Sequence, residues 1–192
     1  MKKIVILTGA GISAESGIST FRDQDGLWEG MKPEDVASPA AFLDDPERVH
    51  HFYNHRRAQL SAVMPNAAHY ALTRLIESGV YEVTVVTQNV DDLHERAGTS
   101  NLYHIHGELN KARCTRCDIV VDWLGDLTIA DICGVCGASL RPHIVWFGEM
   151  PIGTEKIKQS VTSSDLFIAI GTSGVVQPAA MYALYAKLSG SH

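Results

Sequence analysis

The chain has 192 residues, of which 45% are hydrophobic and 20% are charged, a size that suits one sizeable core or one core with a small added module. Its formal net charge of -6 provides no broad attraction to nucleic acid or to an anionic membrane, and the sequence has no evident basic patch. The apolar run at residues 4–7 is too short for a signal peptide or a membrane span, so we expect a cytoplasmic protein.

Three aliphatic runs predict strands of one parallel sheet. They occupy residues 4–7, 83–86 and 166–170, and each ends in small polar residues. Continuous aliphatic runs are typical of parallel strands that are buried on both faces. We therefore expect an α/β fold with a Rossmann-like sheet, in which the carboxyl ends of the strands share a ligand crevice.

Helical patterns lie between these runs. They cover residues 46–60, 66–78, 92–97, 154–163 and 178–188. Asn66 suits the N-cap of the second helix, and Pro178 suits the first turn of the last one.

Two stretches interrupt the strand and helix alternation and predict a smaller domain. Residues 1–30, 66–109 and 142–192 are expected to form the parallel-sheet domain. Residues 31–65 and 110–141 are expected to form the smaller one, from a helical segment and a cysteine module.

A glycine loop, TGAGISAESGISTFR, follows the first aliphatic run. Gly9 and Gly11 permit close backbone approach to a pyrophosphate, and a helix that begins after them would present free N–H groups to an anion. The fingerprint of hydride-transfer enzymes requires a third glycine and then a second strand. Ala14 stands where that glycine would be, and residues 21–28 predict no strand, so the ordinary dehydrogenase interpretation fails.

Polar residues follow the second and third aliphatic runs, at the expected crevice. They are Gln88, Asn89, Asp91, Gly171, Thr172 and Ser173. Their amides, carboxylate and hydroxyls suit a ribose, a phosphate or a carboxamide. From the residues alone, an Asx turn before the helix at 92–97 and a plain turn after the third strand are alternatives.

Two histidines, His104 and His106, are two apart on an apparent strand at residues 102–105, so both could face one side. An imidazole titrates near neutrality and suits a general base. The pair alone does not choose between the two residues or exclude a metal site.

Tyr53 and Arg56 are spaced i, i+3 on the predicted helix at 46–60 and share a face. A guanidinium and a phenol can hold a carboxylate through charge-assisted hydrogen bonds. A solvated arginine and a packed tyrosine are the alternative.

The four cysteines form the pattern C-x2-C-x15-C-x2-C. They are Cys114, Cys117, Cys133 and Cys136. Two such knuckles let four thiolates surround one Zn²⁺ tetrahedrally, which leaves no position for water or substrate and predicts a structural ion. A zinc ribbon that binds nucleic acid is an alternative, with only Arg113 and Arg116 beside the first knuckle to support it.

These motifs, in this order, resemble the sirtuins, NAD-dependent protein lysine deacylases, over nearly the whole chain. The motifs are GAGISAESGISTFR at 9–22, TQNVD at 87–91, HIHGE at 104–108, the paired cysteines, RPHIVWFGE at 141–149 and GTS at 171–173. GLW at 26–28 and YNHR at 53–56 are most similar to the bacterial enzymes of class III, which prefer acidic acyl groups.

The resemblance implies that NAD is consumed as a substrate and that acylated lysine-bearing proteins or peptides are the partners. The acyl-lysine oxygen would attack C1′ of the nicotinamide ribose, nicotinamide would leave, and the acyl group would end on ADP-ribose. His106 is implied as the general base, with Asn89 and Asp91 as further catalytic residues. The implied NAD-binding residues are Gly9, Ala10, Gly11, Ser13, Phe21, Arg22, Gln88, Asn89, Asp91, Gly171, Thr172 and Ser173.

The resemblance also implies how the acyl-lysine peptide binds. Tyr53 and Arg56 would hold the carboxylate of succinyl- or malonyl-lysine, and Ala37 would leave room for the longer chain, with acetyl groups accepted as well. Four residues would pair through their backbone with an extended peptide: Val145, Trp146, Phe147 and Gly148. From the residues alone, these four are equally a buried strand end.

An ADP-ribosyl transferase or an NAD-binding sensor on the same fold is the alternative function. Family members continue past the last residues of this chain, so we expect part of the Rossmann-like NAD-binding domain to be missing and an edge of its sheet to be exposed.

Overall fold

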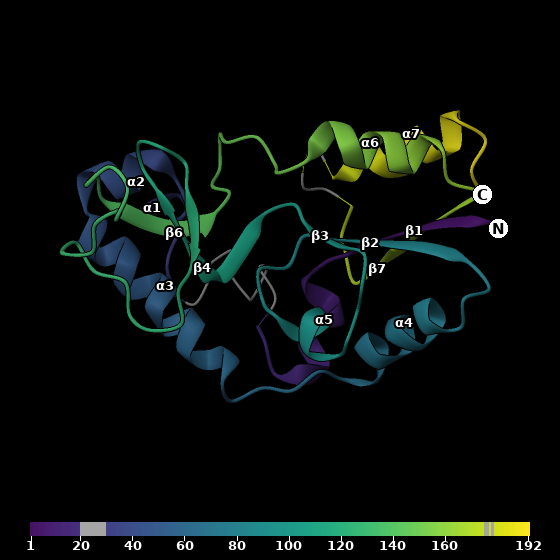
Figure 1. Cartoon of the computed structure of the whole chain (residues 1–192), viewed down its shortest axis with the longest axis horizontal. Helices are drawn as coiled ribbons and strands as arrows, with labels where there is room; N and C mark the ends of the chain where they lie inside the picture. Colours follow the sequence, from purple (N-terminus) through teal and green to yellow (C-terminus); the bar gives the residue numbers. More distant parts are fainter. Residues whose placement is uncertain (20–29, 175–176, 178) are drawn as a thin grey trace.

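A parallel sheet of four strands, in the order β3-β2-β1-β7, forms the larger lobe of the molecule (Figure 1). The computed structural model describes residues 1–19, 30–174, 177 and 179–192. The strands are β1 (Lys3–Thr8), β2 (Glu82–Thr87), β3 (Leu102–His104) and β7 (Leu166–Ile170). β1 pairs in parallel with β2 and with β7, as the aliphatic runs predict, and β3 adds a parallel strand beside β2 that no aliphatic run predicted.

The edge strand β7 differs from the prediction that every run is buried on both faces. The central strand β1 is buried from its second residue onward, whereas the residues of β7 are half-buried and Ala169 is exposed. In the described residues β7 pairs with β1 on one side, and His192 alone reaches its other side, where the Phe167 N–H donates to the His192 carbonyl at 2.9 Å.

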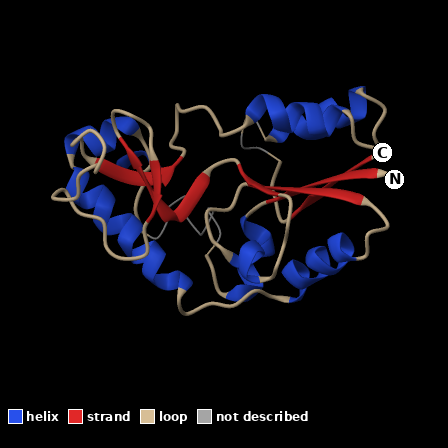
Figure 2. Ribbon diagram, viewed as in Figure 1, coloured by secondary structure: helices blue, strands red, loops and turns tan. Residues whose placement is uncertain are grey.

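Helices cover both faces of this sheet (Figure 2). On one face lie α4 (Ala67–Glu77) and α5 (Leu93–Arg96), and on the other lie α6 (Thr154–Thr162) and α7 (Ala180–Leu188). Asn66 caps α4 as predicted, because its side chain accepts from the Ala68 N–H at 3.0 Å. The helix predictions hold to within two residues, and Pro178 lies outside the described residues.

The loop after β1 forms two short 3-10 turns, η1 (Ala10–Ile12) and η2 (Ala14–Ser16). The expected helix beginning after Gly11 is therefore wrong. Gly17 takes a φ of +93°, a left-handed conformation that ends the second turn and that glycine adopts without strain.

The smaller lobe packs three helices against an antiparallel sheet. The helices are α1 (Pro33–Val36), α2 (Pro39–Asp44) and α3 (Pro46–Leu60), and the sheet runs β5 (Val120–Asp122), β4 (Gly107–Cys114), β6 (Leu140–Ile144). The core of this lobe includes Val49, Phe52, Leu109 and Trp146. The expected domain boundaries after residues 109 and 141 fall within β4 and β6, and the division into two domains stays a prediction.

Arg57 connects α3 to the rest of the smaller lobe. It is 4% exposed, and its guanidinium donates to the carbonyl of Leu109 at 2.6 Å and of Gly125 at 3.2 Å. The neighbouring Asn54 accepts from Arg57 at 2.8 Å and from the Leu127 N–H at 2.9 Å. Helix α3 is thereby bonded both to β4 and to the loop that precedes the second cysteine pair.

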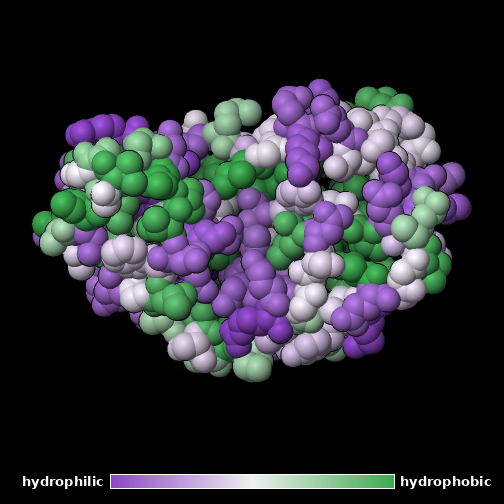
Figure 3. Space-filling model, in the orientation of Figure 1, coloured by the Kyte–Doolittle hydropathy of each residue, from purple (hydrophilic) through white to green (hydrophobic). Residues whose placement is uncertain are grey.

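None of the helices in the described residues combines the length and the apolar character that crossing a bilayer requires. One group of exposed apolar residues lies on the smaller lobe, at the left of Figure 3. Leu43, Leu124, Ile132 and Val135 are each more than half exposed.

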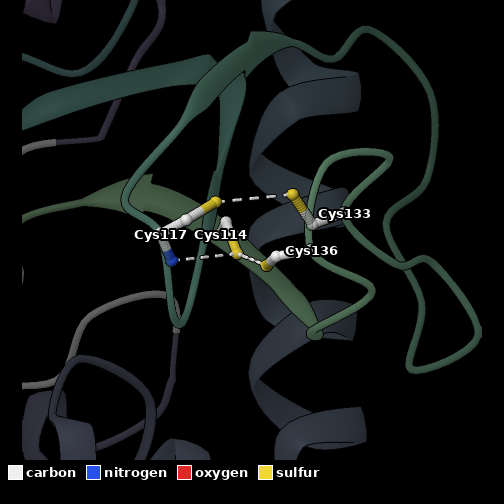
Figure 4. Close-up of side chains that lie close together, drawn as sticks. All are labelled: Cys114, Cys117, Cys133 and Cys136. Atoms are coloured by element: carbon white, nitrogen blue, oxygen red, sulfur yellow. Dashed lines mark hydrogen bonds between the residues drawn. The ribbon is translucent and has the colours of Figure 1, made fainter.

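The four cysteine thiols converge on one point between two loops of the smaller lobe (Figure 4). The Sγ of Cys114 lies 3.3 Å from that of Cys136, the Sγ of Cys117 lies 3.6 Å from that of Cys133, and all four lie within 4.8 Å of one another. Four thiolates at about 2.3 Å from one tetrahedral ion lie about 3.8 Å apart. The donor set and its geometry fit a structural Zn²⁺ site.

Loss of one thiolate is expected to remove the ion and destabilise the smaller lobe. For Cys133→Ser we expect one bound zinc per chain to fall to near zero, and a stability loss of more than about 4 kcal/mol, typical of a lost metal site. At about 2–4 °C per kcal/mol this lowers the Tm by about 10 °C. Zinc content by atomic emission and a thermal melt check both.

Val135→Ser is the matched control, because Val135 lies in the same knuckle with its side chain 72% exposed. A Cys133→Ser protein that kept its zinc and its Tm would contradict the assignment.

Candidate active site

A cavity of about 430 Å³ lies between the two lobes, at the carboxyl edge of the parallel sheet. The larger lobe contributes Gly9, Ala10, Gly11, Gln88, Asn89, Asp91, His106, Gly171, Thr172 and Ser173 to its wall. The smaller lobe and the segment after β6 contribute Ala37, Tyr53, Arg56, Val145, Trp146, Phe147 and Gly148. Residues from several separate sequence motifs therefore line the same cavity.

One described residue of the predicted set, Ser13, does not line it. Ser13 is fully buried behind the wall, and Phe21 and Arg22 lie outside the described residues. Sequence reasoning missed the apolar wall of Ile18, Leu109 and Ile144, whose only signal was the apolar pattern of their segments.

The glycines of the loop after β1 and of the loop after β7 contact one another. The Gly9 N–H donates to Ile170 at 3.1 Å and the Gly11 N–H donates to Gly171 at 2.8 Å, in both cases to the carbonyl. A Cβ on Gly11 would lie 2.8 Å from the Cα of Gly171, and Gly171 itself has a φ of +62°. Contact between loops, and not only approach to a ligand, therefore requires glycine here.

A buried hydrogen-bond chain holds the loop after β2. The side-chain amide of Asn89 donates to Ser13 Oγ at 3.0 Å, and that hydroxyl donates to Asp91 at 3.0 Å. The other carboxylate oxygen of Asp91 accepts from the Leu93 N–H at 3.1 Å, which is an Asx turn. Burial raises the pKa of Asp91, while these hydrogen bonds lower it. Asp91 thus forms the turn and also faces the cavity.

His106 lies in the turn between β3 and β4, because β3 ends at His104 and does not continue to residue 105 as predicted. Its Nδ1 is 3.1 Å from the carbonyl oxygen of Gln88. A carbonyl only accepts, so Nδ1 carries the hydrogen and Nε2 keeps its lone pair. Burial lowers the pKa of His106, which leaves the imidazole neutral at pH 7. This is the state a general base requires.

The described residues give no support to the metal alternative for the two histidines. The cysteines form the one cluster there that could hold an ion, and neither histidine belongs to it.

The far end of the cavity carries a buried positive charge. Arg56 is 5% exposed, which rules out the solvated alternative, and Tyr53 is fully buried beside it. The indole N–H of Trp146 donates to Tyr53 Oη at 3.0 Å, and burial raises the pKa of the phenol. The tyrosine is therefore neutral, and its own proton is not used in the bond to Trp146.

The segment after β6 uses its own N–H groups within the protein. Val145 donates to the His106 carbonyl at 2.9 Å, and Phe147 donates to the Ala37 carbonyl at 3.0 Å. The Trp146 N–H donates to Glu149 at 2.8 Å, and Glu149 is paired with Arg141. Any extended ligand here must bond to the carbonyls or to Gly148.

Comparisons with known proteins bear on this cavity. The Sir2 family profile matches residues 9–178. The chain is 55% identical over 194 residues to an NAD-dependent protein deacylase of Escherichia coli O6:H1 (strain CFT073), covering 99% of this chain and 71% of that protein.

Two solved structures share its fold. A complex of a Sir2 homologue with NAD superposes with a TM-score of 0.90 at 46% identity, covering 99% of this chain and 75% of that one. A complex of Sir2 with a p53 peptide and NAD+ gives 0.82 at 32% identity, covering 98% and 78%. The resemblance seen in the motifs is thus confirmed, and the chain belongs to the Sir2 family of NAD-dependent protein deacylases.

Proposed function

We propose that this chain removes acyl groups from protein lysine side chains with NAD as co-substrate, and that it releases nicotinamide, free lysine and O-acyl-ADP-ribose. One observation carries the proposal: a single cavity joins the glycine loops, the neutral His106 and the buried Arg56. The NAD and peptide complexes of its relatives support both substrates.

The glycine loops are suited to the dinucleotide. Gly9, Ala10 and Gly11 present backbone rather than bulky side chains to the cavity, as a pyrophosphate requires. Gly171, Thr172 and Ser173 would contact a phosphate or the adenosine ribose. The side chain of Gln88 donates to Thr172 Oγ1 at 2.8 Å and so holds the two walls together. Ser13, buried behind the wall, would act through its bond to Asn89.

His106 would take the proton of the reaction. The bond between nicotinamide and C1′ of its ribose breaks as the amide oxygen of the acyl-lysine bonds to C1′. A ribose hydroxyl then attacks the acyl carbon and gives its proton to Nε2 of His106. Water completes the release of lysine, and the acyl group stays on the ribose.

Asn89 and Asp91 would orient the reacting groups. The Asn89 side chain offers a carbonyl to a ribose hydroxyl or an ordered water, and Asp91 can accept from the carboxamide N–H₂ of nicotinamide. Both are 6% exposed, so water competes little for these bonds.

Tyr53 and Arg56 would recognise an acidic acyl group. The guanidinium and the phenolic O–H can both donate to the carboxylate of a succinyl or malonyl chain, and Ala37 leaves space beside them. An acetyl group fits the same space without these bonds, so both activities are expected. The peptide backbone would pair with carbonyls of the segment 145–148 other than that of Trp146, which accepts from the Glu149 N–H at 2.9 Å, since the N–H groups of residues 145–147 are already used.

Mass spectrometry of succinyl-lysine and acetyl-lysine peptides, incubated with the protein and NAD, tests the function. We expect free lysine together with nicotinamide and an acylated ADP-ribose. ADP-ribose attached to the peptide would show an ADP-ribosyl transferase, and NAD binding without turnover would show a sensor. Either result would overturn the proposal.

Replacement of His106 by alanine is expected to lower kcat by about 10²- to 10⁴-fold, the usual contribution of a general base.

In the unaltered chain, kcat/KM should be at its maximum at pH 7. It should fall as the pH drops below 6.5 through the lowered pKa of His106, because only the neutral imidazole accepts the proton. Rates from pH 5 to 8 check this.

His51→Ala is the control for this variant, since His51 is exposed on α3. A fully active His106→Ala protein would disprove the assignment of the base.

Replacement of Arg56 by methionine is expected to change acyl selectivity. Loss of charge-assisted bonds worth about 1.5–3 kcal/mol should lower kcat/KM for succinyl-lysine by about 10- to 100-fold, with little change for acetyl-lysine. Parallel assays on the two peptides measure the ratio. Arg48→Met, at a half-buried arginine of the same helix that does not line the cavity, should leave the ratio unchanged. Equal losses on both peptides would refute the carboxylate clamp.

A further inference from the structure

The ring of His104 is held between two oxygen atoms of the loop and helix that follow β2. Its Nδ1 lies 2.9 Å from the carbonyl oxygen of Asn89, and its Nε2 lies 2.7 Å from the carboxylate of Glu95 on α5. The side chain of His104 is 7% exposed and that of Glu95 is 42% exposed. The deacylase motifs assign no role in the site to His104.

These two partners determine the charge on the ring. A carbonyl oxygen only accepts, so Nδ1 must carry a hydrogen. An ionised carboxylate also only accepts, so Nε2 must carry one as well. A protonated Glu95 could donate instead, but a half-exposed carboxyl gives up its proton far more readily than an imidazole does. The ring is therefore an imidazolium.

The groups that face His104 agree with this charge. Burial lowers its pKa, but the hydrogen bond and the charge of Glu95, with Glu108 on β4, raise the pKa above its ordinary value. Burial, then the charge of His69 and then that of His104 lower the pKa of His94 to about 4. Burial raises the pKa of Asp91, and the positive ring of His104 counteracts part of that rise.

The bond to Asn89 has a counterpart one residue earlier. His106 bonds to the carbonyl of Gln88, and His104 bonds to the carbonyl of Asn89. Two histidines of one segment thus hold two consecutive carbonyls of the loop whose side chains face the cavity. A shift of the Asn89 backbone would move its side chain away from Ser13 and would displace Asp91.

We propose that His104 is a positioning residue for NAD: its imidazolium, held by Glu95, fixes the Asn89 carbonyl and with it the cavity face of residues 88–91. The proposal rests on the proposed function in that NAD occupies this cavity. It also has a consequence for pH. The charged form exists below the raised pKa of His104 and is lost as the pH rises through that value, so NAD affinity should weaken on the alkaline side.

Two measurements on the full chain test the proposal. The nitrogen and Cε1 chemical shifts of the His104 ring, assigned with a His104→Gln variant, report its charge between pH 6 and 10 without any need for turnover. Calorimetric titration with NAD across the same range reports affinity.

Glu95→Gln keeps an acceptor but removes the charge, and Glu77→Gln, exposed on α4, is the matched control. We expect an imidazolium at pH 7 in the unaltered chain. In Glu95→Gln the alkaline midpoint of NAD affinity should move down by about one pH unit or more, as expected for loss of an adjacent opposite charge. At pH values between the midpoint of Glu95→Gln and that of the unaltered chain, the variant should bind NAD about tenfold more weakly than the unaltered chain, while its Tm is little changed. Glu77→Gln should match the unaltered chain.

A neutral His104 ring at pH 7 would overturn the proposal, and so would a Glu95→Gln protein whose NAD affinity follows the unaltered profile. Failure of the proposed function is distinguishable from both. A chain that binds NAD with the expected pH profile but leaves acyl-lysine peptides intact would refute deacylation and retain the role of His104.

Discussion

The contact between the loop after β1 and the loop after β7 determines the shape of the cavity. Because these strands are parallel neighbours, their carboxyl ends lie at the same edge of the sheet and the loops that follow them come into close contact. This contact requires glycine at residues 9, 11 and 171, since only backbones without a Cβ approach so closely. The result is a wall made largely of main-chain atoms, on which a phosphate can lie without meeting a side chain. The other parts of the site are arranged around this wall.

Polar groups behind the wall are bonded to one another before any ligand arrives. Ser13 joins Asn89 to Asp91 across two loops, and the rings of His106 and His104 hold the neighbouring carbonyls. Buried polar groups without partners are costly, so these mutual bonds favour one arrangement over its alternatives. The site therefore requires little rearrangement of these side chains when substrates bind, which is the condition under which oriented dipoles assist a reaction most.

The sequence predicted much of this architecture, because many of its signals are local. Helix α3 begins at Pro46 and α4 follows Asn66, and both residues act within a single turn. The strands follow from aliphatic runs, the thiol cluster from its spacing, and the gathering of motifs from the shared edge of parallel strands. The misses depended on tertiary placement: half-buried β7 lies at the sheet edge, the glycines meet a distant loop, and the partner of His104 is Glu95 on another element. No pattern within a short window contains these contacts.

The bonds made by Arg57 link the cysteine module to one wall of the cavity. Tyr53 and Arg56, which line the cavity, project from the same helix that Arg57 and Asn54 tie to Gly125 and Leu127, just before the second cysteine pair. An ion at the cysteines would therefore support the rigidity of the helix that carries these two cavity residues. Loss of that ion would loosen one wall of the cavity even though no cysteine lines it.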